Sequence, residues 1–144
     1  YASGPAYVGV TFYDVGNNTG SGAPRKNYTV GGTYDFGVVK VHALAQKSTG
    51  ASGLDVLDLM GGVTVPVAGG HLMASYIRHN DRSIGDKDAN QLGIEYLYPL
   101  SKRTSVYTAF GRIQNQHGAA FTVGNATEGG TGTKAFNLGV VHNF

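Results

Sequence analysis

Apolar and polar residues alternate along the end of the chain, from Lys134 to Phe144. Side chains alternate between the two faces of a strand, so one face here is mostly apolar and the other carries small or amide residues. A strand with lipid on one side and water on the other has this pattern. The pattern predicts a membrane-facing strand whose mostly apolar face carries Phe136, Leu138, Val140, His142 and Phe144.

The same alternation recurs upstream and predicts seven further strands. They are expected over residues 6–13, 27–36, 38–46, 56–65, 71–79, 90–98 and 104–113. Residues 1–5 are expected to form a loop. In the seventh strand two sets of residues compete for the apolar face, and the alternation does not choose between them. The first set contains Tyr107 and Ala109, and the second contains Val106 and Phe110.

The connections between the predicted strands alternate in length. Polar, loop-forming stretches follow the first, third, fifth and seventh strands, whereas short turns follow the second, fourth and sixth. Outer-membrane barrels have long extracellular loops and short periplasmic turns. We therefore expect an all-β, antiparallel up-and-down transmembrane β-barrel fold with eight strands in this chain and both chain ends on the periplasmic side.

Composition narrows the alternatives. The 144 residues suit a single domain over residues 1–144, and no apolar run is long enough for a membrane helix. The absence of cysteine excludes disulfides and thiolate metal sites. A net charge of +2 with scattered basic residues gives no indication of nucleic-acid binding. The chain lacks an initiator methionine, so we expect a mature product or a piece of a longer protein.

Several motifs resemble one family. The segment QLGIEYLYPLSKRTSVYTAFGRI over residues 91–113 resembles the penultimate hairpin of trimeric Gram-negative porins of the neisserial and burkholderial type. GVVHNF over residues 139–144 is similar to the family's terminus, with Val141 where an arginine is common. The resemblance implies a 16-stranded barrel of which this chain is the C-terminal half. The family's constriction loop would then lie in the other half.

Charged and polar residues on the faces opposite the apolar ones are candidates for the pore lining. They are Lys40, His42, Gln46, Asp58 and Glu95. Lys40 and His42 would favour anions, because cationic side chains raise the local anion concentration. The plainer alternative is a polar wall of mixed charge. Arg78 and Arg112 lie near the outer strand ends, where they could guide solutes, bind lipopolysaccharide phosphates or simply remain rim charges.

Aromatic residues near the strand ends are candidates for the two membrane interfaces, where such residues form girdles. They are Tyr28, Tyr34, Phe36, Tyr76, Tyr96, Tyr98 and Phe144. The resemblance further implies that Phe144 and its alternate neighbours, Phe136 to His142, are the signal read by the barrel-assembly machinery. Packing at the membrane interface is the plainer role of this face.

No cofactor or metal site is expected. The segment around Asp86 and Asp88 has the acidic spacing of a calcium loop but lacks the glycine and glutamate that such a loop needs. The expected function is a water-filled outer-membrane channel for passive diffusion of small hydrophilic solutes and ions, acting as a homotrimer among lipid and lipopolysaccharide. A small closed eight-stranded barrel serving as an adhesin or anchor is the alternative. A lipolytic enzyme is a third.

Overall fold

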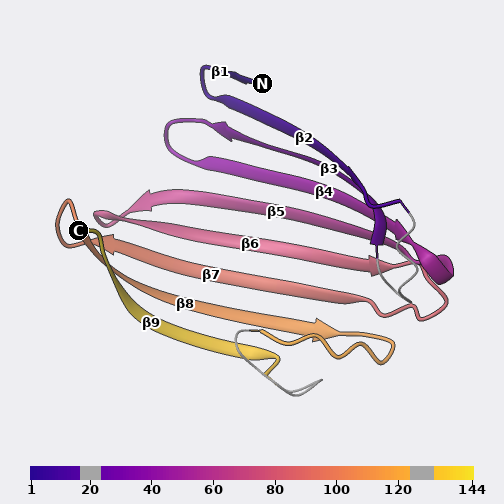
Figure 1. The fold of residues 1–144 in the computed structure, drawn as a ribbon. Helices are drawn as coiled ribbons and strands as arrows, with labels where there is room; N and C mark the ends of the chain where they lie inside the picture. The colour runs from indigo at the N-terminus through magenta and orange to yellow at the C-terminus, as the bar shows by residue number, and fades with distance from the viewer. Residues whose placement is uncertain (17–23, 124–131) are drawn as a thin grey trace.

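The computed structural model describes residues 1–16, 24–123 and 132–144. Within them the chain forms one antiparallel sheet of nine strands in sequence order (Figure 1). The strands are β1 (Ala2–Ser3), β2 (Ala6–Asp14), β3 (Pro24–Asp35), β4 (Lys40–Gly50), β5 (Asp55–Val67), β6 (Gly70–Asp81), β7 (Ala89–Pro99), β8 (Thr104–Asn115) and β9 (Lys134–His142). The all-β, antiparallel, up-and-down prediction is confirmed.

The expected loop over residues 1–5 and both ends of the third predicted strand are wrong. Residues 1–5 are not all loop, because Ala2 pairs with Tyr7 and Ser3 with Ala6 to form β1. The third predicted strand begins at Lys40 and continues to Gly50, since Thr49 pairs with Asp55 across the hairpin. Polar residues beyond the apolar stretch still satisfy ladder hydrogen bonds, so the strands extend past the alternation that predicts them.

The long and short connections lie at opposite ends of the sheet, as predicted, with one exception. Residues 15–23, 82–88 and 116–133 connect strands at one end, although residues 17–23 and 124–131 lie outside the described part. The connection between β4 and β5 belongs to this end but is short, consisting of the 3-10 turn Ala51–Gly53 and Leu54. At the other end, Ala68 and Gly69 both have positive φ, as a two-residue type I′ hairpin requires.

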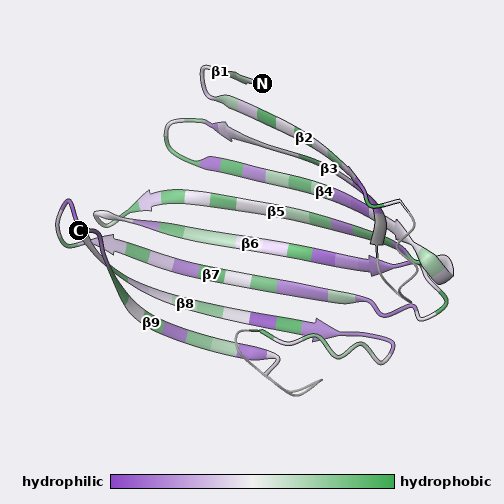
Figure 2. Ribbon diagram, in the orientation of Figure 1, coloured by the Kyte–Doolittle hydropathy of each residue, from purple (hydrophilic) through white to green (hydrophobic). Residues whose placement is uncertain are grey.

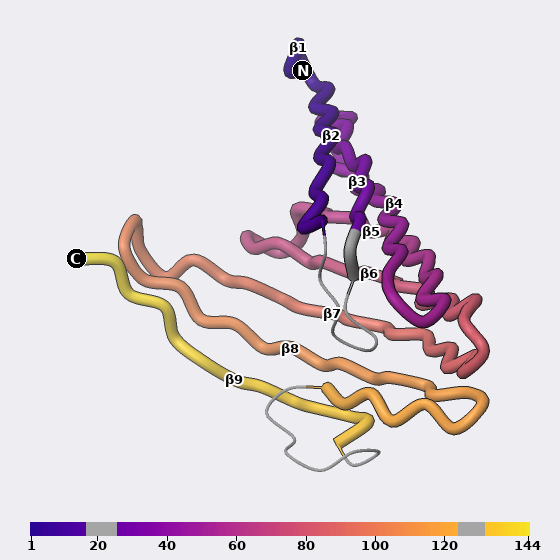
Figure 3. The backbone as a smooth tube through the Cα atoms, turned by 45° about the vertical axis from the view of Figure 1, so that its right-hand side comes forward, coloured from indigo at the N-terminus to yellow at the C-terminus, as the bar shows by residue number. Residues whose placement is uncertain are grey.

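The sheet is open in the described part of the chain. β2 lies between β1 and β3, and β9 pairs with β8, so β2 and β9 do not meet. Figure 3 shows the sheet as a curved, open wall with the two termini far apart. The alternative of eight strands closed on themselves is therefore wrong for this chain. An open edge cannot persist in lipid, because its backbone groups need partners.

The two faces of the sheet have opposite character, and Figure 2 shows the alternation along each strand. Directly opposed residues of an antiparallel pair lie on the same face, so the register assigns every strand residue to one face. The polar face carries His42, Asp58 and Glu95. The register also decides the seventh predicted strand, because Phe110 lies opposite Ile94 and Phe136. We call the second face the apolar face; it carries Val10, Tyr28, Val30, Leu59, Val63, Leu72, Tyr76, Leu92, Ile94, Phe110, Phe136 and Leu138.

The sheet has almost no interior. Within the described residues the buried apolar side chains are Val56, Ala89 and Ile113, whereas Val10 is 75% exposed and Leu138 77% exposed. In water, so large an exposed apolar surface would mark a binding interface or an aggregation hazard. Across the adjacent strands β2–β9 it instead matches a wall that faces lipid. Among the described residues, no helix is long and apolar enough to cross a membrane.

Candidate functional site

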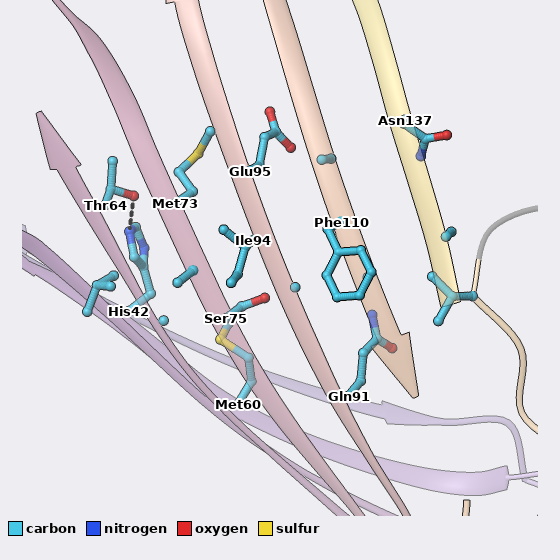
Figure 4. A pocket seen from close by; sticks show the side chains of 18 residues that line it. His42, Met60, Thr64, Met73, Ser75, Gln91, Ile94, Glu95, Phe110 and Asn137 are labelled. Atoms are coloured by element: carbon cyan, nitrogen blue, oxygen red, sulfur yellow. Dashed lines mark hydrogen bonds between the residues drawn. The ribbon is translucent and has the colours of Figure 1, made fainter. Parts of the chain in front are cut away.

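A hollow of about 450 Å³ lies on the polar face between β4 and β9. Figure 4 shows the side chains around it, which come from successive strands of the wall. The polar ones are His42, Thr64, Ser75, Gln91, Glu95 and Asn137, and Met60 and Met73 lie among them. Glycines on this face leave space in the hollow because they carry no side chain. Gly62 is opposite Ser75, and Gly93 is opposite Gly111.

All five predicted pore-lining residues lie on the polar face, but they do not cluster. Lys40 lies opposite Asp35 at the short-turn end, and the His42 ring shares a 3.0 Å hydrogen bond with the Thr64 hydroxyl. Gln46 accepts a 3.3 Å hydrogen bond from Thr29 and lies opposite Asp58. His42 and Glu95 line the hollow. The five residues therefore belong to a wall, not to one binding centre.

The charge on the polar face is predominantly negative within the described strands. Asp35, Asp58, Asp81 and Glu95 lie on it, and Lys40 is its lysine. The other strand cations whose side chains are described lie on the apolar face, near the long connections. They are Lys26, Lys47, Arg78, Arg112 and Lys134. Arg78 and Arg112 are therefore not placed to guide solutes through the hollow.

A segment that sequence reasoning missed covers part of this wall. Residues 119–123 follow β8 and lie on the polar face. Asn115 holds them through two hydrogen bonds: its Nδ2 donates to the Phe121 carbonyl oxygen at 2.9 Å, and its Oδ1 accepts from the Phe121 N–H at 3.2 Å. The Phe121 ring contacts the His79 ring edge-on, with centroids 4.9 Å apart. His79 Nδ1 in turn lies 2.6 Å from a carboxylate oxygen of Asp58.

A second hollow of about 480 Å³ lies between this segment and the wall. Asp58, His79, Gln91 and Phe121 line it. Deeper along the wall, Val123 occupies space that a side chain at position 111 would need, since a Cβ on Gly111 would lie 2.8 Å from Val123. The glycine thus lets the segment approach β8. Alternation analysis detects strands, so it has no signal for a segment that folds back onto them.

Three potential metal ligands meet at the end of the sheet with the long connections. Asp86, Asp88 and His117 bring ligand atoms within 4.8 Å of one another. His117 lies far from the two aspartates in the sequence, so their spacing alone did not predict the cluster. His117 Nδ1 is 3.2 Å from Asp86 Oδ2, and Asp88 accepts a 2.9 Å hydrogen bond from the Asp81 N–H. These contacts tie the β6–β7 and β8–β9 connections together.

The predicted interface aromatics fall near both ends of the apolar face. Tyr34, Tyr96 and Tyr98 lie toward the short turns, and Tyr28 and Tyr76 lie in the half nearer the long connections. Phe36 stands in the turn after β3 with its ring 4.5 Å from that of Tyr34, and Phe144 follows β9 and is fully exposed. The position of these rings fits two girdles. Their role at the membrane interface stays a prediction.

A single-layer wall with a polar, hollowed face and an apolar, exposed face defines part of an outer-membrane β-barrel. The chain belongs to the Gram-negative porin family, whose pattern matches residues 1–118. The protein is thus an outer-membrane porin in fold and location.

Two relatives show the extent of the likeness. The chain is 30% identical over 115 residues to outer membrane porin protein 32 of Delftia acidovorans, a match that covers 76% of this chain and 32% of that protein. It superposes on an anion-selective porin from Comamonas acidovorans with a TM-score of 0.76 and 26% identity, covering 100% of this chain and 47% of that one. The chain therefore spans about a third to a half of these relatives.

Proposed function

We propose that this chain forms one side of a water-filled channel through which small hydrophilic solutes and ions diffuse passively. The observation that carries the proposal is the polar face, which presents charged and hydrogen-bonding side chains over a hollow that extends from β4 to β9. Small residues such as Gly62 and Gly93 leave that space open, whereas a barrel filled by side chains would need bulky ones. Selection by such a wall is steric and electrostatic and involves no reaction.

The charge of the wall supports a specific role in selectivity. The Comamonas relative is anion-selective, yet the described polar face of this chain carries Asp35, Asp58, Asp81 and Glu95 against Lys40. Fixed charge of one sign raises the local concentration of the opposite ion. We expect this part of the wall to favour cations, so any preference for anions would originate elsewhere in the full-length protein.

The test is single-channel conductance of the full-length protein in planar bilayers. We expect stable, ohmic current steps at low voltage that appear in groups of three if the protein is a homotrimer. Refolded protein that inserts into the bilayer and carries no current would overturn the proposal. Insertion is followed separately by protection of the strands from added protease.

The segment around Phe121 is placed to narrow the mouth of the proposed channel. Removing the Phe121 ring tests this role. Phe121→Ala deletes the ring that rests on His79 and is expected to raise the single-channel conductance, because the segment loses its contact with the wall. Tyr76→Ala on the apolar face is the matched control and should leave conductance unchanged, since that ring points away from the hollow. Equal conductance of Phe121→Ala and the unmodified protein would show that residues 119–123 do not narrow the passage.

The family suggests three further interactions, which we propose for this protein. They are assembly into a homotrimer, contact with lipopolysaccharide, and recognition by the barrel-assembly machinery. The face of β9 from Phe136 to His142, with Phe144 beyond it, is the proposed assembly signal. The exposure of Phe136, Leu138 and Val140, each at least 66%, leaves this face accessible for recognition.

A further inference from the structure

The second hollow, between residues 119–123 and the wall, combines an apolar lining with a carboxylate. Two of the three buried apolar side chains in the described part of the chain, Ala89 and Ile113, line it. Ile77 and Phe121 also line it, and Phe121 is still 39% exposed. The segment and the wall therefore enclose a partly dry space of about 480 Å³, which is within the range of small-molecule sites.

Asp58 carries the negative charge of this hollow. Its Oδ1 lies 2.6 Å from His79 Nδ1, which donates the proton of this bond because an ionised carboxylate can only accept. Within the described residues, the hydrogen bond from His79 leaves the second oxygen, Oδ2, without a partner, and 27% of the Asp58 side chain is exposed. A solute that enters the hollow thus meets an available acceptor.

The surroundings of Asp58 do not neutralise its charge with lysine or arginine. Neither residue type lines the described part of the hollow. Lys40, on the same face, is six residues along β4 from Gln46, the residue opposite Asp58. At about 3.4 Å per residue this separation is roughly 20 Å, or about two screening lengths at 0.1 M salt. Asp81 lies nearer, two residues from His79 on this face. The charge of the hollow therefore favours a cation.

We propose that this hollow binds amphipathic organic cations, solutes that join an ammonium group to an aromatic or aliphatic body. The ammonium group donates to Asp58 Oδ2, and the body packs between Phe121 and the side chains of Ile77 and Ile113. An inorganic cation would use only the carboxylate, and a neutral apolar solute would use only the apolar lining. A solute with both features matches the whole site.

Solutes reach this hollow from the channel. Gln91 lines both hollows, so the two adjoin, and Figure 4 shows its side chain in the first one. The inference therefore rests on the proposed function, because the polar face is open to solutes only if it borders a water-filled passage. It adds a class of solute that the channel would retain on its way through.

The test titrates 2-phenylethylammonium into the detergent-solubilised full-length protein and follows binding by ligand-observed NMR. Asp58→Asn keeps the shape of the side chain and removes its charge, so we expect binding about tenfold weaker. Phe121→Ala removes the aromatic contact and should weaken binding about fivefold. Glu95→Gln is the matched control, because it removes a carboxylate of the same face that does not line this hollow, and its affinity should stay within about twofold.

Two further probes separate the parts of the site. 2-Phenylethanol keeps the ring and lacks the charge, so it should bind the unmodified protein about as weakly as the cation binds Asp58→Asn. Ethylammonium keeps the charge and lacks the ring, so Phe121→Ala should not alter its affinity. Equal binding of 2-phenylethylammonium to Asp58→Asn and to the unmodified protein would overturn the site. Equal binding of 2-phenylethanol and the cation would also overturn it, because the hollow would then select apolar solutes without regard to charge.

Failure of this inference is distinguishable from failure of the proposed channel. Heat-modifiable mobility on electrophoresis shows that each variant has folded. Binding in detergent requires no ion current, so a conducting protein that does not bind the cation would overturn the site alone. A protein that binds the cation and inserts into bilayers without carrying current would overturn the proposed channel.

Discussion

Glu95→Lys in the full-length protein is expected to shift the ratio of cation to anion permeability roughly fivefold toward anions. Glu95 lines the hollow on the polar face, in the middle of β7. A unit charge about 8 Å from a passing ion in water is worth about 0.5 kcal/mol, and screening at about 0.1 M salt roughly halves this value. Reversing the sign of the charge shifts the energies of a cation and an anion in opposite directions, so their energy difference changes by about 1 kcal/mol. The measurement is the reversal potential across a bilayer with a salt gradient.

Salt and a matched variant make this prediction specific. Asp14→Lys makes the same change of charge on the apolar face, which does not line the hollow, and should leave the reversal potential unaltered. The Glu95→Lys effect should shrink as the salt is raised from about 0.1 M to 1 M, because the screening length falls from about 10 Å to about 3 Å. An equal shift in both variants would indicate a general effect of charge and not a role of the wall.

Gly32→Ala is expected to destabilise the barrel by about 1–3 kcal/mol, the range for forcing extra atoms into a packed site. A Cβ at this position would lie 2.6 Å from the Tyr7 carbonyl oxygen. The obstacle is backbone of the neighbouring strand β2, so the pairing of β2 and β3 must shift to admit the methyl group. Urea unfolding of the refolded full-length protein, followed by circular dichroism, measures the change.

Gly61→Ala is the control for this substitution. Gly61 lies on the same face in the middle of β5, and a Cβ there would meet no atom within 4 Å. Alanine is also better suited to a strand than glycine, which loses more conformational freedom on folding. We expect Gly61→Ala to be neutral or slightly stabilising. If both variants unfold at the same urea concentration as the unmodified protein, the close approach at Gly32 has no energetic weight.

The strands could be predicted because their two faces meet different solvents. Because one face meets lipid and the other meets water, apolar and polar residues alternate along each strand, and a single segment is enough to show this. Val41, His42 and Ala43 of β4 are an example. Motifs such as Leu100–Thr104 indicated the porin family, and the match of residues 1–118 to that family confirms it. Strand ends were less predictable, because Ser48 and Thr49 extend β4 through backbone hydrogen bonds that do not depend on hydropathy.

The candidate site was predictable only in part, because alternation within a strand assigns residues to a face and does not show which residues of other segments they contact. Alternation assigned Lys40, His42, Gln46, Asp58 and Glu95 to the polar face, but it carries no information on which strands adjoin across the hollow. The contact of Phe121 with His79 joins residues 42 positions apart, and the cluster of Asp86, Asp88 and His117 joins two separate connections. Contacts of this kind depend on how loops fold back over the sheet.

For this protein, local chemistry was enough to define a two-faced antiparallel wall in the outer membrane, because each strand carries the signature of its own two environments. Register and topology were needed for the rest. Only pairing between strands shows that the sheet stays open over the described residues, that Arg112 and Lys134 oppose each other on the apolar face, and that the negative charges share the other face. These properties belong to neighbouring strands together, so no single strand encodes them.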